Sequence, residues 1–94
     1  MPLFVINCFD KPDSLDLRLA TRPSHVAYLK ASPALKLAGP YLNASGEPDG
    51  TMLVIEAESL AAAEAFAAAD PYAEAGLFAR TEVRAFSHTL GQLP

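Results

Sequence analysis

The sequence holds one cysteine, Cys8, so no disulfide can form within the chain. Only 7 of the 94 residues are Lys or Arg, against 11 Asp or Glu, and the formal net charge is −4. Because nucleic-acid binding needs clustered positive charge, the absence of a basic tract argues against a nucleic-acid partner. No apolar run approaches the roughly 18 residues of a membrane-spanning helix.

Several short motifs are also missing. The sequence contains no Gly-rich phosphate loop, no dinucleotide-binding fingerprint and no pair of histidines at metal-ligand spacing. Residues 1–6 lack the basic region and cleavage site of a secretory signal. These absences predict a cytoplasmic protein that uses no cofactor or metal and contacts neither nucleic acid nor membrane.

The chain is predicted to form one domain over residues 1–94. A domain of this size buries only about 60–65% of its unfolded surface. Hydrophobic residues make up 51% of the sequence, which is high for so short a chain and leaves apolar surface for a partner.

The residue pattern predicts four strands, two helices and a short helical turn. The strands are expected over 3–9, 35–42, 51–57 and 77–86, the helices over 14–32 and 60–69, the turn over 71–75, a loop over 43–50 and a loose tail over 87–94. Pro23 indicates either a kink in the first helix or a break with Thr21 as a new N-cap. Gly39-Pro40 predicts an edge position or a bulge for the second strand, because proline cannot donate to a strand ladder.

This order, strand-helix-strand-strand-helix-strand, is typical of the ferredoxin-like α+β fold, with a four-stranded antiparallel sheet and both helices on one face. Strands 3–9 and 51–57 are apolar on both faces, whereas two helices cover only one. The simplest second cover is the same sheet of another copy, which predicts a sheet-to-sheet homodimer.

The first helix has an unusual apolar stripe. At about 100° per residue, its predicted buried face consists of Leu15, Leu19, Arg22, Val26 and Leu29. Arg22 lies in the middle of this stripe and His25 lies beside it. Since a buried charge is costly without a partner, the helix is predicted to cover a polar partner or to line a cleft.

His25 is the candidate acid–base group, because a histidine pKa of about 6.5 suits proton transfer near neutral pH. The alternative is a histidine at the core edge with one satisfied hydrogen bond. Asp70 is an N-cap candidate before Pro71, and the topology brings it to the edge that His25 approaches, where a carboxylate would fix the imidazole tautomer. Arg22 either binds an anionic substrate or pairs with Asp70 or Glu74.

Three other reactive residues are weaker candidates. Cys8 lies mid-strand and is predicted to be a small core residue rather than a nucleophile. Ser24 neighbours His25 on a helix and therefore does not face it. His88 falls in the predicted tail, where solvent surrounds it.

The segments Arg22-Pro23-Ser24-His25 and Asp70-Pro71-Tyr72, together with Asp13-Ser14-Leu15, Arg18-Leu19 and Gly39-Pro40, resemble the YciI-like (YCII-related) family of the dimeric α/β-barrel superfamily. The resemblance spans residues 3 to about 86. It implies a ferredoxin-like fold, a dimer and a His–Asp dyad, which map onto His25 and Asp70. Some relatives remove chloride from chlorinated lactones or hydroxyquinone-type compounds.

The resulting prediction is a small dimeric enzyme that performs a lyase, dehalogenase-like or hydrolytic step on a small anionic organic molecule. His25 and Asp70 are the predicted catalytic pair, and Arg22, Tyr72 and Gly39 are the predicted substrate-binding residues. The alternative is a non-catalytic dimer that binds a ligand or partner and uses the same groups as a structural network.

Overall fold

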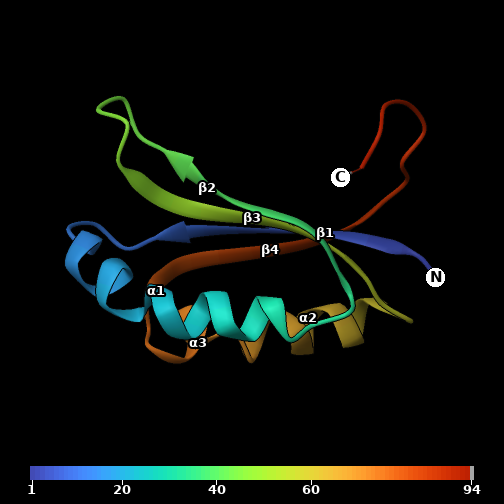
Figure 1. Cartoon of the computed structure of the whole chain (residues 1–94), viewed down its shortest axis with the longest axis horizontal. Helices are drawn as coiled ribbons and strands as arrows, with labels where there is room; N and C mark the ends of the chain where they lie inside the picture. Colours follow the sequence, from blue (N-terminus) through green and yellow to red (C-terminus); the bar gives the residue numbers. More distant parts are fainter. Residues whose placement is uncertain (94) are drawn as a thin grey trace.

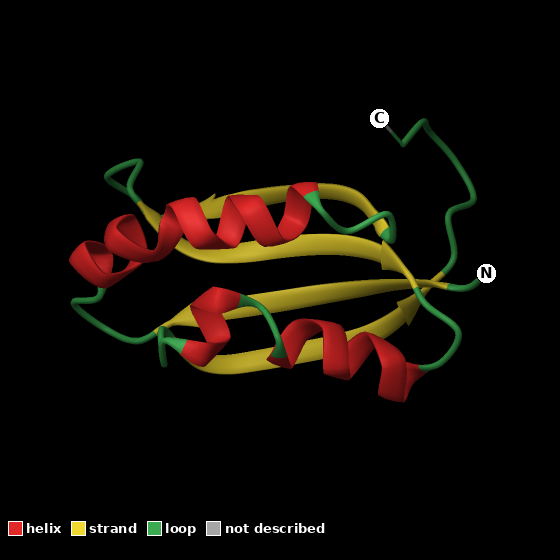
Figure 2. Ribbon diagram, turned by 60° about the horizontal axis from the view of Figure 1, so that its bottom comes forward, coloured by secondary structure: helices red, strands yellow, loops and turns green. Residues whose placement is uncertain are grey.

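The computed structural model describes residues 1–93, which form a four-stranded antiparallel sheet with helices on one face (Figures 1 and 2). The strands are β1 (Leu3–Asp10), β2 (Leu35–Leu42), β3 (Pro48–Glu56) and β4 (Phe78–Phe86), and the helices are α1 (Leu15–Lys30), α2 (Leu60–Ala68) and α3 (Pro71–Glu74). The strand order is β2-β3-β1-β4, and every neighbouring pair is antiparallel. The predicted ferredoxin-like α+β fold is confirmed.

The core lies between the sheet and the helices. Figure 2 shows α1 lying beside α2 and α3 on the same face of the sheet. Side chains alternate along a strand, so every second residue of β1 points into this layer: Phe4, Ile6 and Cys8 are all buried there. In β3, Leu53 and Ile55 pair with Ile6 and Phe4 and complete the centre of the core.

The other side of the sheet, called the open face below, has no helix against it (Figure 1). Its central residues, given by the strand register, are Leu3, Val5, Asn7, Phe9, Leu37, Tyr41, Met52 and Val54. At one end, the Phe9 and Tyr41 rings stack with centroids 5.9 Å apart, and the Arg80 guanidinium lies 4.5 Å from the Phe9 ring centroid. Figure 1 shows the β2–β3 turn and the segment after β4 rising from opposite ends of this face.

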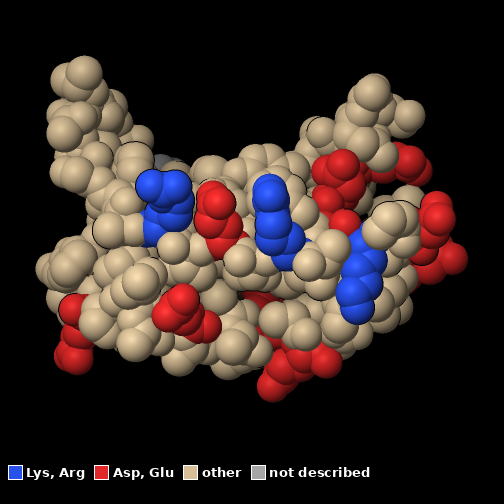
Figure 3. Space-filling model, turned by 180° about the vertical axis from the view of Figure 1, so that it is seen from behind, with Lys and Arg blue, Asp and Glu red and all other residues tan. Residues whose placement is uncertain are grey.

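Both edge strands carry features that oppose pairing with another strand. The edge position predicted for Gly39-Pro40 is confirmed, although the register shifts of β2 lie near its ends rather than at this dipeptide. On β4, Arg80, Glu82 and Arg84 alternate with residues on the helix side. The view from behind shows a row of basic and acidic side chains running across the molecule (Figure 3). Proline and charge on edge strands discourage edge-to-edge association.

The first helix differs from its prediction in rotation. α1 runs without a break through Pro23, but its buried residues are Arg18, His25 and Leu29. Leu19 is 53% exposed, and Arg22, predicted at the centre of the buried stripe, is exposed. The helix is therefore turned by about 60° from the predicted orientation. This is possible because both buried polar side chains have carboxylate partners, described below.

Element boundaries shift where local hydrogen bonds decide them. β3 begins at Pro48 rather than at residue 51, because the preceding turn is closed by a hydrogen bond from the Asn43 N–H to the Glu47 carbonyl (2.9 Å). Gly76, with φ of 77°, ends the α3 segment as predicted. Residues 87–93 contain no helix or strand, and the last residue of the predicted tail, 94, lies outside the described residues.

No helix within residues 1–93 is long and apolar enough to cross a membrane.

We predict that Cys8 is unreactive in the native protein. It is 2% exposed, and burial raises its pKa to about 11, so little thiolate forms near neutral pH. An aromatic disulfide reagent should label it only after denaturation. A Cys8→Ala/Ser45→Cys variant, with its thiol in the exposed turn, is the control and should react at once. Rapid labelling of the native wild type would contradict the burial of β1.

Candidate functional site

A cavity of about 170 Å³ lies between α1 and the sheet. We call it the α1 pocket; it is lined by Arg18, Arg22, His25, Val26, Leu29, Ala38, Gly39, Pro40, Thr51 and Tyr72. Four of the predicted site residues, Arg22, His25, Gly39 and Tyr72, therefore lie around one cavity. The fifth, Asp70, is buried behind His25 and contacts its ring.

His25 and Asp70 form a buried hydrogen-bonded pair. Nδ1 of His25 lies 2.8 Å from Oδ1 and 3.0 Å from Oδ2 of Asp70. An ionised carboxylate only accepts hydrogen bonds, so Nδ1 is the donor and Nε2 of the neutral ring carries the free lone pair. Among the described residues, no buried side-chain nitrogen or oxygen lacks a partner, and no bond to Nε2 occurs. Nε2 therefore reaches the accessible surface, at the α1 pocket.

The Asp70-Pro71-Tyr72 segment explains how this carboxylate is positioned. The residue before a proline avoids the helical region, and Asp70 is extended, with φ of −61° and ψ of 130°. Its side chain then caps α3 by accepting the Tyr72 N–H at 2.9 Å. The same Oδ1 atom therefore starts a helix and holds the imidazole.

Tyr72 packs directly on His25. The two rings stack with centroids 3.9 Å apart and 19° between their planes, and Tyr72 is 1% exposed. Burial raises the pKa of Tyr72, while the charges of Arg18 and Arg22 oppose that rise. The phenol is therefore uncharged at neutral pH and is able to donate a hydrogen bond.

Arg18 forms a second buried charge pair beside the first. Its Nε and Nη2 atoms donate to Asp10 at 2.7 and 2.9 Å, and Nη2 also donates to Thr51 Oγ1 at 2.8 Å. Its guanidinium carbon lies 4.6 Å from the Tyr72 ring centroid, within cation–π distance. Burial alone would lower the pKa of Arg18. The hydrogen bonds and the charge of Asp10 outweigh this effect and raise the pKa above its usual value, so the side chain stays charged.

No prediction from the sequence places Arg18, Asp10 or Thr51 in the site. A signal was present: Arg18, His25 and Leu29 are spaced by seven and four residues, which places them on one helix face. The apolar stripe of the first helix favoured Arg22 instead, because Arg22 lies in the middle of that stripe, where a charged residue is unusual.

The remaining candidates lie elsewhere or show no pairing. Arg22 lines the α1 pocket from its exposed position, and no ion pair with Asp70 or Glu74 occurs among the described residues. Gly39 lines it with its backbone, and a Cβ there would meet no protein atom within 4 Å. Ser24 is exposed, and His88 bonds to the Gly91 carbonyl at 2.7 Å in the tail.

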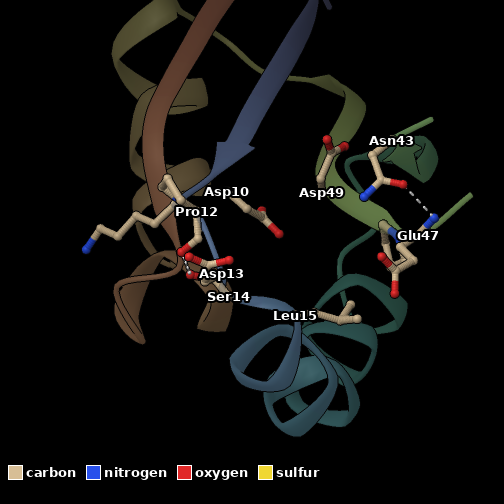
Figure 4. Close-up of a pocket in the computed structure, with 10 residues that line it drawn as sticks. Asp10, Pro12, Asp13, Ser14, Leu15, Asn43, Glu47 and Asp49 are labelled. Carbon is tan, nitrogen blue, oxygen red and sulfur yellow. Dashed lines mark hydrogen bonds between the residues drawn. The ribbon is translucent and has the colours of Figure 1, made fainter. Parts of the chain in front are cut away.

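A larger hollow of about 320 Å³ lies between the β1–α1 loop and the β2–β3 turn. Figure 4 shows Asp10 and Asp13 on its β1–α1 side and Glu47 and Asp49 on its β2–β3 side. Within residues 1–93, no group of at least 3 His, Cys, Asp or Glu residues is arranged to hold a metal ion. This acidic hollow contains no histidine, so the base and its carboxylate identify the smaller α1 pocket as the candidate site.

Comparison with known proteins identifies the family of this chain. The model of the YCII-related domain matches residues 2–87. Protein YciI of Escherichia coli O6:H1 and protein YciI of Shigella flexneri are each 41% identical over 93 residues, covering 89% of this chain and 95% of theirs. The chain belongs to the YCII-related family. The resemblance seen in the sequence is thereby confirmed.

Solved structures extend the comparison. The 5-chloro-2-hydroxyhydroquinone dehydrochlorinase of Burkholderia phenoliruptrix, solved with 2,5-dihydroxybenzoquinone, is 37% identical over 93% of this chain and 95% of its own, with a TM-score of 0.83. An antibiotic biosynthesis monooxygenase covers 96% of this chain and 100% of its own with a TM-score of 0.59. At 14% identity, this second similarity concerns the fold alone.

The Asp10–Arg18 pair yields a stability prediction. Arg18→Met leaves a buried carboxylate without its partner and should lower the free energy of unfolding by about 3–5 kcal/mol. In Asp10→Leu/Arg18→Met neither charge remains, so urea denaturation should show much of that loss recovered. Lys36→Met, which removes the more exposed Lys36–Glu56 pair, should shift the midpoint little. If the double variant lost as much unfolding free energy as Asp10→Leu and Arg18→Met lose in sum, the pairing would be contradicted.

Proposed function

We propose that this protein is an acid–base enzyme that acts on a small organic anion in the α1 pocket without a cofactor. The observation that carries the proposal is the His25–Asp70 pair, in which Nδ1 is bonded and Nε2 opens to the pocket. A base in this arrangement takes a proton from a bound molecule, and the carboxylate 2.8 Å away stabilises the imidazolium that forms.

The proposed reaction class is elimination. The dehydrochlorinase that is 37% identical to this chain gives the chemistry a precedent. Loss of HCl needs one base: His25 takes the proton, the electron pair of the broken bond forms a new double bond, and chloride leaves with its bonding pair. No oxidant or reductant is consumed. Arg22, Tyr72 and the backbone of Gly39, which all line the pocket, are the proposed substrate contacts.

We further propose that the open face packs on the same face of a second copy. The edge strands are poor pairing surfaces, since β2 contains Pro40 and β4 carries alternating charges. Apolar side chains of β1 and β3, among them Val5 and Met52, remain partly exposed on the open face. A face of this composition is a natural two-fold contact, because the same patch meets itself.

We expect His25→Ala to reduce turnover of 5-chloro-2-hydroxyhydroquinone by about 10²–10⁴-fold while the protein remains folded. Chloride release measures the reaction, and circular dichroism monitors folding. Ser24→Ala, which changes the exposed neighbour on the same helix, is the matched control and should retain turnover. Unchanged turnover in His25→Ala would overturn the catalytic assignment, and unfolding would favour the non-catalytic reading of the network.

For the dimer, we expect analytical ultracentrifugation at micromolar concentration to give twice the 10.0 kDa chain mass. Val5→Glu places a carboxylate in the middle of the open face and should yield monomers, because charge burial opposes association. The control Ala65→Glu adds the same charge on the exposed side of α2 and should leave the dimer intact. A folded wild-type monomer would refute this assembly.

A further inference from the structure

The hydrogen bonds of the described residues engage Nε and Nη2 of Arg18 but not Nη1, and the Tyr72 phenol lies close enough to the guanidinium to help raise its pKa. A guanidinium offers five N–H donors, and three of these, one on Nε and two on Nη2, bond to Asp10 and Thr51. Among the hydrogen bonds of residues 1–93, none involves Nη1. Because no buried side-chain nitrogen in the same residues lacks a partner, Nη1 reaches the accessible surface where Arg18 lines the α1 pocket.

This donor group is held in place before any ligand arrives. Arg18 is 3% exposed, and its guanidinium donates two parallel hydrogen bonds to the two oxygens of Asp10. This bidentate geometry fixes the orientation of a guanidinium. It lies two helical turns, about 10.5 Å, before His25 on α1, and the Tyr72 ring contacts both side chains. A molecule in the pocket therefore meets a base from one side chain and a fixed cation from the other.

Arg18 also differs from Arg22 in its surroundings. Arg22 is exposed, so water and salt screen its charge. Apart from Nη1, Arg18 is enclosed by protein, and a hydrogen bond from a largely buried cation to an anion is stronger than a screened surface contact. The Asp10 carboxylate offsets part of the positive charge, so removal of that carboxylate would strengthen the attraction for an anion.

We infer that Nη1 of Arg18 is the anion receptor of the α1 pocket and donates to a charged oxygen of a small planar organic molecule, such as a phenolate, enolate or carboxylate. The inference rests on the proposed function in taking this pocket as the substrate site. It moves the main anion contact from Arg22, the residue chosen from the sequence, to Arg18.

A structural role and a receptor role for Arg18 predict different patterns. If the Asp10–Arg18 pair only holds the fold, replacing either partner weakens ligand binding in the same direction. If Nη1 binds the ligand, Asp10→Asn keeps the donor and frees its charge, so anion affinity rises. Asp10→Asn/Arg18→Gln removes both charges without leaving one unpaired, and anion affinity falls.

The test uses calorimetric titration of the folded protein with 2,5-dihydroxybenzoquinone, whose acidic hydroxyls are ionised at neutral pH. We expect Asp10→Asn/Arg18→Gln to weaken binding by about 10–100-fold, the size of one hydrogen bond to a charged group. Arg22→Gln should weaken it a few-fold, and Lys30→Gln, an exposed charge at the end of α1, should leave it unchanged. Neutral hydroquinone should bind all variants alike and weakly.

The inference is overturned if the wild type does not bind this anion, if Asp10→Asn weakens binding as much as the double variant, or if hydroquinone binding shows the same dependence on Arg18. Loss of binding in the double variant together with a gain in Asp10→Asn supports it. Turnover that requires His25 but ignores Arg18 would refute only this inference. Arg18-dependent binding without any turnover would refute only the proposed function.

Discussion

The structure depends on one electrostatic constraint: α1 turns Arg18 and His25 toward the sheet, and each buried polar side chain requires a carboxylate partner. An unpaired buried charge costs several kcal/mol, which is a large part of the 5–15 kcal/mol that stabilises a typical domain. Asp10 at the end of β1 and Asp70 before α3 meet this requirement. The rotation of α1, and with it the position of the α1 pocket, follows from these two pairs.

Asp70 serves both a helix cap and the proposed acid–base pair. It caps α3 through the Tyr72 N–H and fixes His25 through Nδ1, while Tyr72 packs on the ring that Asp70 orients. A group with two such contacts has little freedom, so the free nitrogen of His25 is held in a constant position. Preorganisation of this kind is what a proton-transfer site needs, because no binding energy is then used to align the base.

The two faces of the sheet differ in what they contact. The helix side holds the core and the α1 pocket, whereas the open face bears apolar side chains and the Phe9–Tyr41–Arg80 cluster. This division keeps the α1 pocket on the helix side of the sheet. It leaves the open face available for contact with a second copy.

The sequence by itself determined the order of the elements and the cap at Asp70, because each depends on residues close together in the chain. It limited Gly39-Pro40 to an edge position or a bulge, and the strand order decided for the edge. It also singled out His25 and Asp70 by residue type and by motif. The tertiary structure decided which face of α1 is buried and brought Arg18 to Thr51 and His25 to Asp70, across separations of 33 and 45 residues. The hydrophobic pattern favoured Arg22 over Arg18, since periodicity reports where apolar side chains lie and contains no information about which carboxylate neutralises a buried charge.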